Sequence, residues 1–208
     1  MGLLSLLIRD PLAFILLAVP LLYSVIFHEL AHGWVANKMG DPTARMLGRL
    51  SLNPLKHLDP MGTLMLFLFG FGWAKPVPVN FNNLPRTGKA MMWVSSAGII
   101  ANMILAFLSI LMMQTLPSAS QGLNGAILDR MANINIMLAA FNLIPIPPLD
   151  GSKIFMGFLP PKYQYSLSRL EPYGLFIIIG LLYLHLLDPV IFFFSWIIHS
   201  FINLFIFG

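Results

Sequence analysis

Five consecutive residues, His28-Glu29-Leu30-Ala31-His32, have the types and spacing of a metal-dependent hydrolytic site. On a helix, side chains four residues apart lie on one face, so His28 and His32 can bind one zinc ion together. The carboxylate of Glu29 is placed to accept a proton from a water molecule that the metal activates. The segment before the motif, Pro11 to Phe27, contains no charged side chain. The motif therefore predicts zinc-assisted hydrolysis at the depth of a membrane.

A catalytic zinc ion usually has three protein ligands and one position for water, so a third ligand must lie elsewhere in the chain. The extended motif with a third histidine is excluded, because it needs Gly and His where the chain has Val35 and Lys38. The chain has no cysteine, which excludes a thiolate ligand. The remaining candidates are acidic or histidine side chains distant in sequence: Asp41, His57, Asp59, Asp150, Glu171, His185, Asp188 and His199.

Asp150 is the candidate that its local sequence favours. Three prolines shortly before it, Pro145, Pro147 and Pro148, prevent a regular helix there. An irregular segment that ends in Asp150-Gly151 can direct a carboxylate back toward a neighbouring helix. The same carboxylate would also suit the N-cap of a following helix, and both interpretations fit a helix start.

The elements that position these residues are predicted to be membrane helices. Of the 208 residues, 58% are hydrophobic and only 10% are charged, whereas a soluble domain carries about 25% charged residues. The mean hydropathy is +0.81. A polar exterior cannot be built from this composition, so we expect an all-α polytopic membrane protein in contact with the lipid bilayer. No basic cluster interleaved with aromatic residues suggests a nucleic-acid partner.

A transmembrane helix needs about 20 mostly apolar residues. Five segments qualify or nearly qualify, at about 11–37, 89–116 and 126–143, and in an apolar stretch at 174–207 that Asp188-Pro189 divides in two. This pattern predicts about five transmembrane helices. We expect residues 1–155 to form the functional core, and residues 156–208 to add a C-terminal helical hairpin to the same membrane domain.

The region at about 45–85, between the first two spans, is predicted to be a small membrane-associated β-hairpin or re-entrant loop. Its apolar part, Met61 to Gly72, is too short to cross a membrane as a helix, and glycines interrupt it. The residues that follow have the composition of extended chain. Such a segment can pair with an unwound substrate by β-augmentation, and we expect Val77, Val79 and Asn80 to contact the substrate there.

The distribution of basic residues predicts the orientation of the chain. Ten of the 12 Lys and Arg residues lie at 38–89 and 153–169, in loops that alternating spans place on one side; only Arg9 and Arg130 lie on the other side. The positive-inside rule then places the N-terminus outside and the histidine motif near the cytoplasmic face.

Together these features resemble the site-2 protease family of intramembrane zinc metalloproteases, in its minimal form without a PDZ or CBS module. The matching segments are 27–33, 52–63, 72–80, Gly98 with Asn102, and 142–151, which together extend over about 25–155. The resemblance implies one Zn²⁺ ion held by His28, His32 and Asp150, with Glu29 as the catalytic acid and base. The chain departs from the family at Ile99, where proline is common.

The resemblance also implies a function: hydrolysis of peptide bonds in or near transmembrane segments of membrane-protein substrates, in a bacterial or archaeal cell membrane. The tetrahedral intermediate of that reaction needs a hydrogen-bond donor for its oxyanion, and Asn142 is our candidate. Asn142 would also suit helix capping or an interhelical hydrogen bond. The alternative function is a non-catalytic metal-binding membrane protein or transporter. Against it, the polar ligands concentrate at one level, and simple metal binding does not require Glu29.

Overall fold

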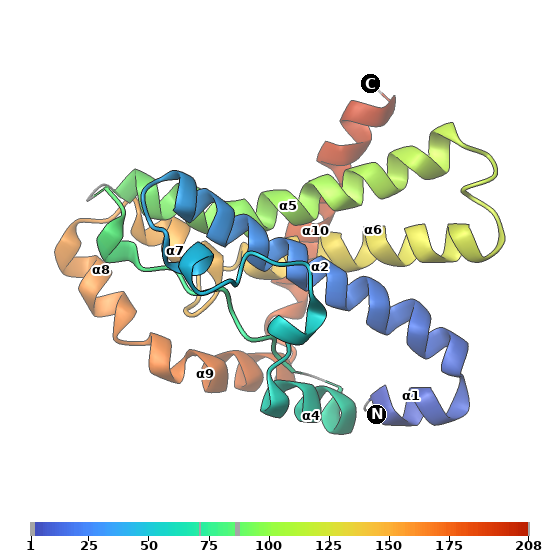
Figure 1. The fold of residues 1–208 in the computed structure, drawn as a ribbon, viewed down its shortest axis with the longest axis horizontal. Coiled ribbons are helices and arrows are strands. Elements are labelled where there is room, and N and C mark those ends of the chain that lie inside the picture. The colour runs from blue at the N-terminus through green and yellow to red at the C-terminus, as the bar shows by residue number, and fades with distance from the viewer. Residues whose placement is uncertain (1–2, 71, 86–87, 208) are drawn as a thin grey trace.

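The computed structural model describes residues 3–70, 72–85 and 88–207, and the described residues form helices and loops without a β-strand (Figure 1). In chain order the elements are α1 (Leu3–Arg9), α2 (Pro11–Lys38), α3 (Thr43–Met46), η1 (Pro54–Lys56), α4 (Pro60–Phe69), η2 (Phe81–Asn83), α5 (Gly88–Thr115), α6 (Gly122–Asn142), α7 (Asp150–Met156), α8 (Pro161–Ser168), α9 (Glu171–Tyr183) and α10 (Asp188–Phe207). The label η denotes a short 3₁₀-helix.

Three of these helices, α2, α5 and α10, are long and apolar enough to cross a membrane within the part of the chain described. Helix α2 begins at Pro11, where the missing N–H costs nothing, and Asp10 caps it by accepting from the Ala13 N–H at 2.9 Å. Helix α6 has 21 residues but carries Asp129 and Arg130. Helix α9 has 13 residues, fewer than the roughly 20 that a span needs. The five predicted spans are thus three clear candidates and two helices of lesser length or hydrophobicity.

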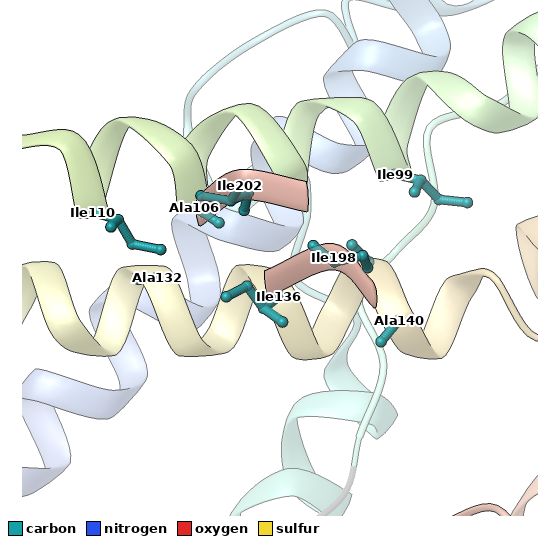
Figure 2. Packing of buried hydrophobic residues seen from close by; sticks show 9 residues of the cluster. Ile99, Ala106, Ile110, Ala132, Ile136, Ala140, Ile198 and Ile202 are labelled. Atoms are coloured by element: carbon teal, nitrogen blue, oxygen red, sulfur yellow. The ribbon is translucent and has the colours of Figure 1, made fainter. Parts of the chain in front are cut away.

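Helices α5 and α6 form an antiparallel pair that α10 crosses, and α2 packs against both members of the pair (Figure 1). Figure 2 shows the apolar core at the crossing, where isoleucine side chains meet alanines on the facing helices. Alanine lets the helix backbones approach closely, which favours packing in lipid. A buried hydrogen bond of 2.8 Å from Asn135 Nδ2 of α6 to Ser24 Oγ of α2 adds a polar link. This frame fixes α2, the helix with the histidine motif.

Between the first two spans we predicted a β-hairpin or a re-entrant loop, and the described residues there form no strand, which argues against the hairpin. The chain there makes one isolated antiparallel bridge, between Leu58 and Ala74. The adjacent Lys75 N–H donates to His57 O at 2.8 Å. The bridge closes the base of a loop whose interior is the helix α4 rather than two strands.

Helix α4 shows why no hairpin forms. Asp59 caps it by accepting from the Gly62 N–H at 2.8 Å, and Gly70 ends it in the left-handed conformation at φ 80°. A helix satisfies its own backbone groups, whereas a two-stranded hairpin leaves edges unpaired at membrane depth. The Phe67 ring lies 5.9 Å from the Phe14 ring. Helix α4 therefore folds back beside the N-terminal part of α2.

Candidate metal and active site

Three potential metal ligands converge where α2 meets the start of α7. His28 Nε2 and His32 Nε2 lie 3.0 Å apart, and each lies 3.0 Å from Asp150 Oδ2. The two histidines are only 7% and 8% exposed. The structure thus brings the predicted ligands together from positions about 120 residues apart in the chain.

The donor set fits one zinc ion. Tetrahedral zinc binds such donors at about 2.0–2.1 Å, which separates neighbouring donors by roughly 3.3 Å, close to the 3.0 Å found between these atoms. Asp150 Oδ2 is buried and receives no hydrogen bond of good geometry, although both Nε2 atoms are near. His32 Nδ1 lies 2.7 Å from Val94 O. An Nδ1–H that donates to this carbonyl leaves the Nε2 lone pair for the metal.

Asp150 is not the cap of α7. The cap position is Leu149, no side chain makes a capping hydrogen bond there, and Asp150 is the first helical residue. A Cβ atom at Gly151 would lie 2.2 Å from Leu143 O, so glycine is needed for the start of α7 to pack against the end of α6. This close packing directs the Asp150 carboxylate toward the two histidines of α2.

Glu29 lies at the same cavity, of about 360 Å³, which the three potential ligands and Asn142 also line. Its Oε2 accepts a hydrogen bond of 2.7 Å from the Val77 N–H. This bond holds the carboxylate at the cavity and joins α2 to the segment that follows α4.

Asn142, the last residue of α6, lines this cavity as well. One of its amide hydrogens is donated to Leu138 O of its own helix, at 2.9 Å. Among the described residues its side chain makes no hydrogen bond to another helix, so the interhelical alternative is not what the structure shows. The second amide hydrogen is available to a bound molecule.

The segment at 76–80, which we call the site segment, lines the cavity with Val77 and Val79 but is not the free strand edge that we predicted. The Val77 side chain is 5% exposed, and its N–H is bound to Glu29. The Asn80 N–H donates to Asp41 Oδ2 at 2.7 Å. Because Pro76 and Pro78 have no N–H, Val79 holds the one N–H of this segment without a partner in the described part of the chain.

Several other candidates for the third ligand have partners elsewhere: Asp41 with Asn80, Asp59 with Gly62, His57 with Ser51, His185 with Asp188, and His199 with Asn203. Glu171 begins α9. Among the described residues, the set of His28, His32 and Asp150 is the only group of three such side chains close enough to share an ion.

Gly98 has a role at the site that sequence reasoning assigned only to helix packing. A Cβ atom at this position of α5 would lie 2.4 Å from His32 Nε2 and 2.6 Å from His28 Nε2. Glycine therefore leaves the space that the two imidazole rings occupy. The sequence signal for Gly98 was its place among the segments that match the family. Its contact with the two histidine rings depends on the packing of α5 on α2 and could not be read from the sequence.

Lys153 is a cavity residue that sequence reasoning missed. It lies one turn after Asp150 on α7, and its Nζ lies 5.6 Å from the centre of the Phe81 ring. The spacing of three residues from Asp150 was a usable signal, because such residues are neighbours on a helix surface.

The fold and the site together define a class: helical proteins with apolar helices long enough to span a membrane and a His-Glu-x-x-His motif whose two histidines, with a distant aspartate, could hold one metal ion. The family model "Peptidase family M50" matches residues 110–184, which include Asn142 and Asp150. The chain belongs to this family, that of the site-2 proteases, as its resemblance indicated. It is a membrane protein of a zinc metalloprotease family, and Zn²⁺ is its metal.

Curated relatives span bacteria and archaea. The chain is 40% identical over 173 residues to "Putative zinc metalloprotease YwhC" of Bacillus subtilis, covering 79% of this chain and 78% of that protein. It is 29% identical over 174 residues to "Putative zinc metalloprotease Rip2" of Mycolicibacterium smegmatis, covering 81% and 67%. It is 27% identical over 152 residues to "Zinc metalloprotease MJ0392" of Methanocaldococcus jannaschii, covering 73% and 37%. No solved structure gives a significant match.

Proposed function

We propose that the protein is an intramembrane zinc endopeptidase, which hydrolyses peptide bonds in or near transmembrane segments of membrane-protein substrates. One observation carries the proposal: His28 and His32, on a helix apolar enough to span a membrane, converge with Asp150 of α7 within 3.0 Å, and Glu29 lies at the same cavity. Membership of a zinc metalloprotease family supports the chemistry. The apolar helices around the site support a substrate in the membrane.

The roles of the side chains follow from their positions. His28, His32 and Asp150 would hold a zinc ion, which would supply Lewis acidity to a water molecule and to the carbonyl of the scissile bond. Glu29 accepts the proton of the attacking water and passes it to the leaving amine. The free amide hydrogen of Asn142 donates to the developing oxyanion.

The site segment presents the substrate to these groups. A transmembrane helix satisfies its own backbone hydrogen bonds, so the substrate must unwind locally before its peptide bond can be attacked. An unwound substrate has backbone carbonyls that need donors, and the Val79 N–H is a free donor beside the cavity. We infer that the substrate pairs with the site segment in extended form at this N–H.

Replacing Val79 by proline is expected to remove most cleavage while zinc binding stays intact. The substitution removes the N–H and changes neither the metal ligands nor the hydrogen bonds of Val77 and Asn80. The measurement is the cleavage rate of a reporter peptide, which is an internally quenched apolar peptide selected from an unbiased library. It is selected because the wild type cuts it and a zinc chelator stops the cleavage. Val79→Ala keeps the N–H and should lose much less activity. Unchanged cleavage by Val79→Pro would show that the substrate does not pair with the Val79 N–H.

Asn142→Ala is expected to lower kcat by about 10²- to 10³-fold with little change in KM, as loss of an oxyanion donor does. Its one described hydrogen bond, to Leu138 O, lies within α6, so the fold should tolerate the change. Kinetics on the reporter peptide check this prediction, with zinc content as the control. An increase in KM alone would assign Asn142 to substrate binding instead.

We infer the orientation from the charge distribution. With ten of 12 Lys and Arg residues in the loops at 38–89 and 153–169, the positive-inside rule places the active site toward the cytoplasm and the N-terminus outside. We propose a multi-pass protein of a bacterial or archaeal cell membrane, which agrees with the origin of its relatives.

The proposed function is tested by comparing membrane proteomes from cells that express the wild type or Glu29→Gln. Single-span proteins should accumulate intact with the variant and be shortened with the wild type. Identical proteomes, together with a metal flux that Glu29→Gln leaves unchanged, would instead favour the metal-binding or transport alternative.

A further inference from the structure

Asp41 is a buried carboxylate just beyond the end of α2, with 0% of its surface exposed. Its Oδ2 accepts the Asn80 N–H at 2.7 Å, and its Oδ1 accepts Asn83 Nδ2 at 2.8 Å. Oδ1 also accepts the N–H of Thr43 at 3.2 Å and the hydroxyl of the same residue. Four donors from two separate parts of the chain therefore meet on one side chain.

The surroundings keep Asp41 ionised. Burial by itself raises the pKa of this carboxyl group, but the hydrogen bonds from Thr43, Asn83 and Asn80 outweigh burial and hold the pKa below its ordinary value. Asp41 is therefore an acceptor on both oxygens at neutral pH. Hydrogen bonds to an ionised group are stronger than those between neutral groups.

Two carboxylates thus hold the site segment. Glu29 binds the Val77 N–H and Asp41 binds the Asn80 N–H, each at 2.7 Å. The free N–H of Val79 lies between these two attachments, and the Val79 side chain packs against a buried cluster formed by Ala36, Leu84, Ala90 and Val94. Glu29 is the proposed catalytic group and must also accept and donate a proton, whereas Asp41 has no role in proton transfer.

We propose that Asp41 is a positioning residue. It fixes the Asn80 end of the site segment, so that the Val79 N–H is held where it can donate to a backbone carbonyl of the substrate. This inference rests on the proposed function, because the position of this N–H matters only if a peptide is bound there. If Asp41 only turned the chain after α2, its local hydrogen bonds with Thr43 would suffice, and asparagine serves such turns as well as aspartate. The further hydrogen bonds from Asn80 and Asn83 connect Asp41 to the site segment and position it.

Asp41→Asn separates these two roles. Its single side-chain oxygen can still accept from Thr43, but an amide NH₂ then faces the Asn80 N–H, and two donors cannot bind each other. Asn83→Ala removes a donor from the same carboxylate without altering Asp41, so it gives a milder second variant. Asp10→Asn is the matched control, because Asp10 caps the N-terminal end of α2, whereas the cavity histidines and Asp41 lie toward the other end of that helix.

The first measurement needs no substrate: hydrogen–deuterium exchange of the zinc-loaded full chain in lipid nanodiscs. Asp41→Asn should raise the exchange rate at 77–83 about tenfold or more, as the loss of a hydrogen bond to a charged group does, while zinc stoichiometry stays at wild type. Asn83→Ala should shift exchange in the same direction and to a smaller extent, and Asp10→Asn should not change this segment. Unchanged exchange at 77–83 in Asp41→Asn overturns the proposal.

The second measurement is kinetics on the reporter peptide. Loosening the site segment should raise KM about tenfold and change kcat by less than about threefold, because Glu29 and the metal ligands are untouched. A lower kcat at unchanged KM, together with a lower Tm, would reduce Asp41 to a structural residue. If the membrane proteomes of wild type and Glu29→Gln are identical, the proposed function fails, and the exchange measurement still decides whether Asp41 orders the segment.

Discussion

Glu29→Gln is expected to keep one zinc ion per chain and to cut the reporter peptide about 10²- to 10⁴-fold more slowly than the wild type, the range that a lost general base produces. Glutamine has nearly the same shape as glutamate, and its oxygen can still accept the Val77 N–H that Glu29 binds at 2.7 Å. The site segment and the ligands should therefore stay in place. Only the capacity to accept a proton is lost.

Two measurements check this variant: zinc per chain by inductively coupled plasma mass spectrometry, and the rate of reporter cleavage. The combination matters, because zinc loss alone would also remove activity. Wild-type cleavage by Glu29→Gln would exclude Glu29 as the base. Loss of zinc together with activity would show instead that the carboxylate supports the metal site.

Gly98→Ala is expected to weaken zinc binding by about 100-fold or more, at least as much as the loss of an outer-shell partner of a metal ligand. The added Cβ would stand 2.4 Å from His32 Nε2 and 2.6 Å from His28 Nε2, so both rings must move away from the position shared with Asp150. Alanine in a helix is favoured over glycine by about 1 kcal/mol. The variant should therefore keep α5 while it loses the metal.

The matched control for this prediction is Gly180→Ala in α9, where an added Cβ would meet no atom within 4 Å. Competition with a zinc-binding dye measures the affinity of both variants, and circular dichroism measures their helix content. Full zinc affinity in Gly98→Ala would contradict the packing of α5 against the two histidine rings. Equal losses in both variants would indicate a general effect of the substitution on the bundle.

The parts of the site that lie on one helix were predictable from the sequence. His28, Glu29 and His32 share α2, and their relation follows from helical spacing alone. For Asp150 the local sequence left two roles open, because it fitted both a metal ligand and a helix cap. The structure places Leu149 in the cap position and turns Asp150 toward α2, and that depends on how closely Gly151 packs on the end of α6.

The region between α2 and α5 was the least predictable part of the fold. Its glycines and prolines indicated a break in regular structure, which is why a β-hairpin or a re-entrant loop was expected. The structure instead forms α4, because the apolar run can satisfy its backbone internally once Asp59 caps it and Gly70 ends it. The attachments of the site segment, Val77 to Glu29 and Asn80 to Asp41, join residues 48 and 39 positions apart. No local pattern reveals contacts of that range.

The measurement that tests the central claim most directly is mass spectrometry of the products formed from a single-span membrane protein, reconstituted in liposomes with the zinc-loaded enzyme. The substrate is taken from the proteins that accumulate with Glu29→Gln. We expect two fragments whose junction lies in or next to the transmembrane segment, formed by the wild type and not by Glu29→Gln. Fragments cut only in the water-exposed parts, or the same fragments with both enzymes, would contradict the claim.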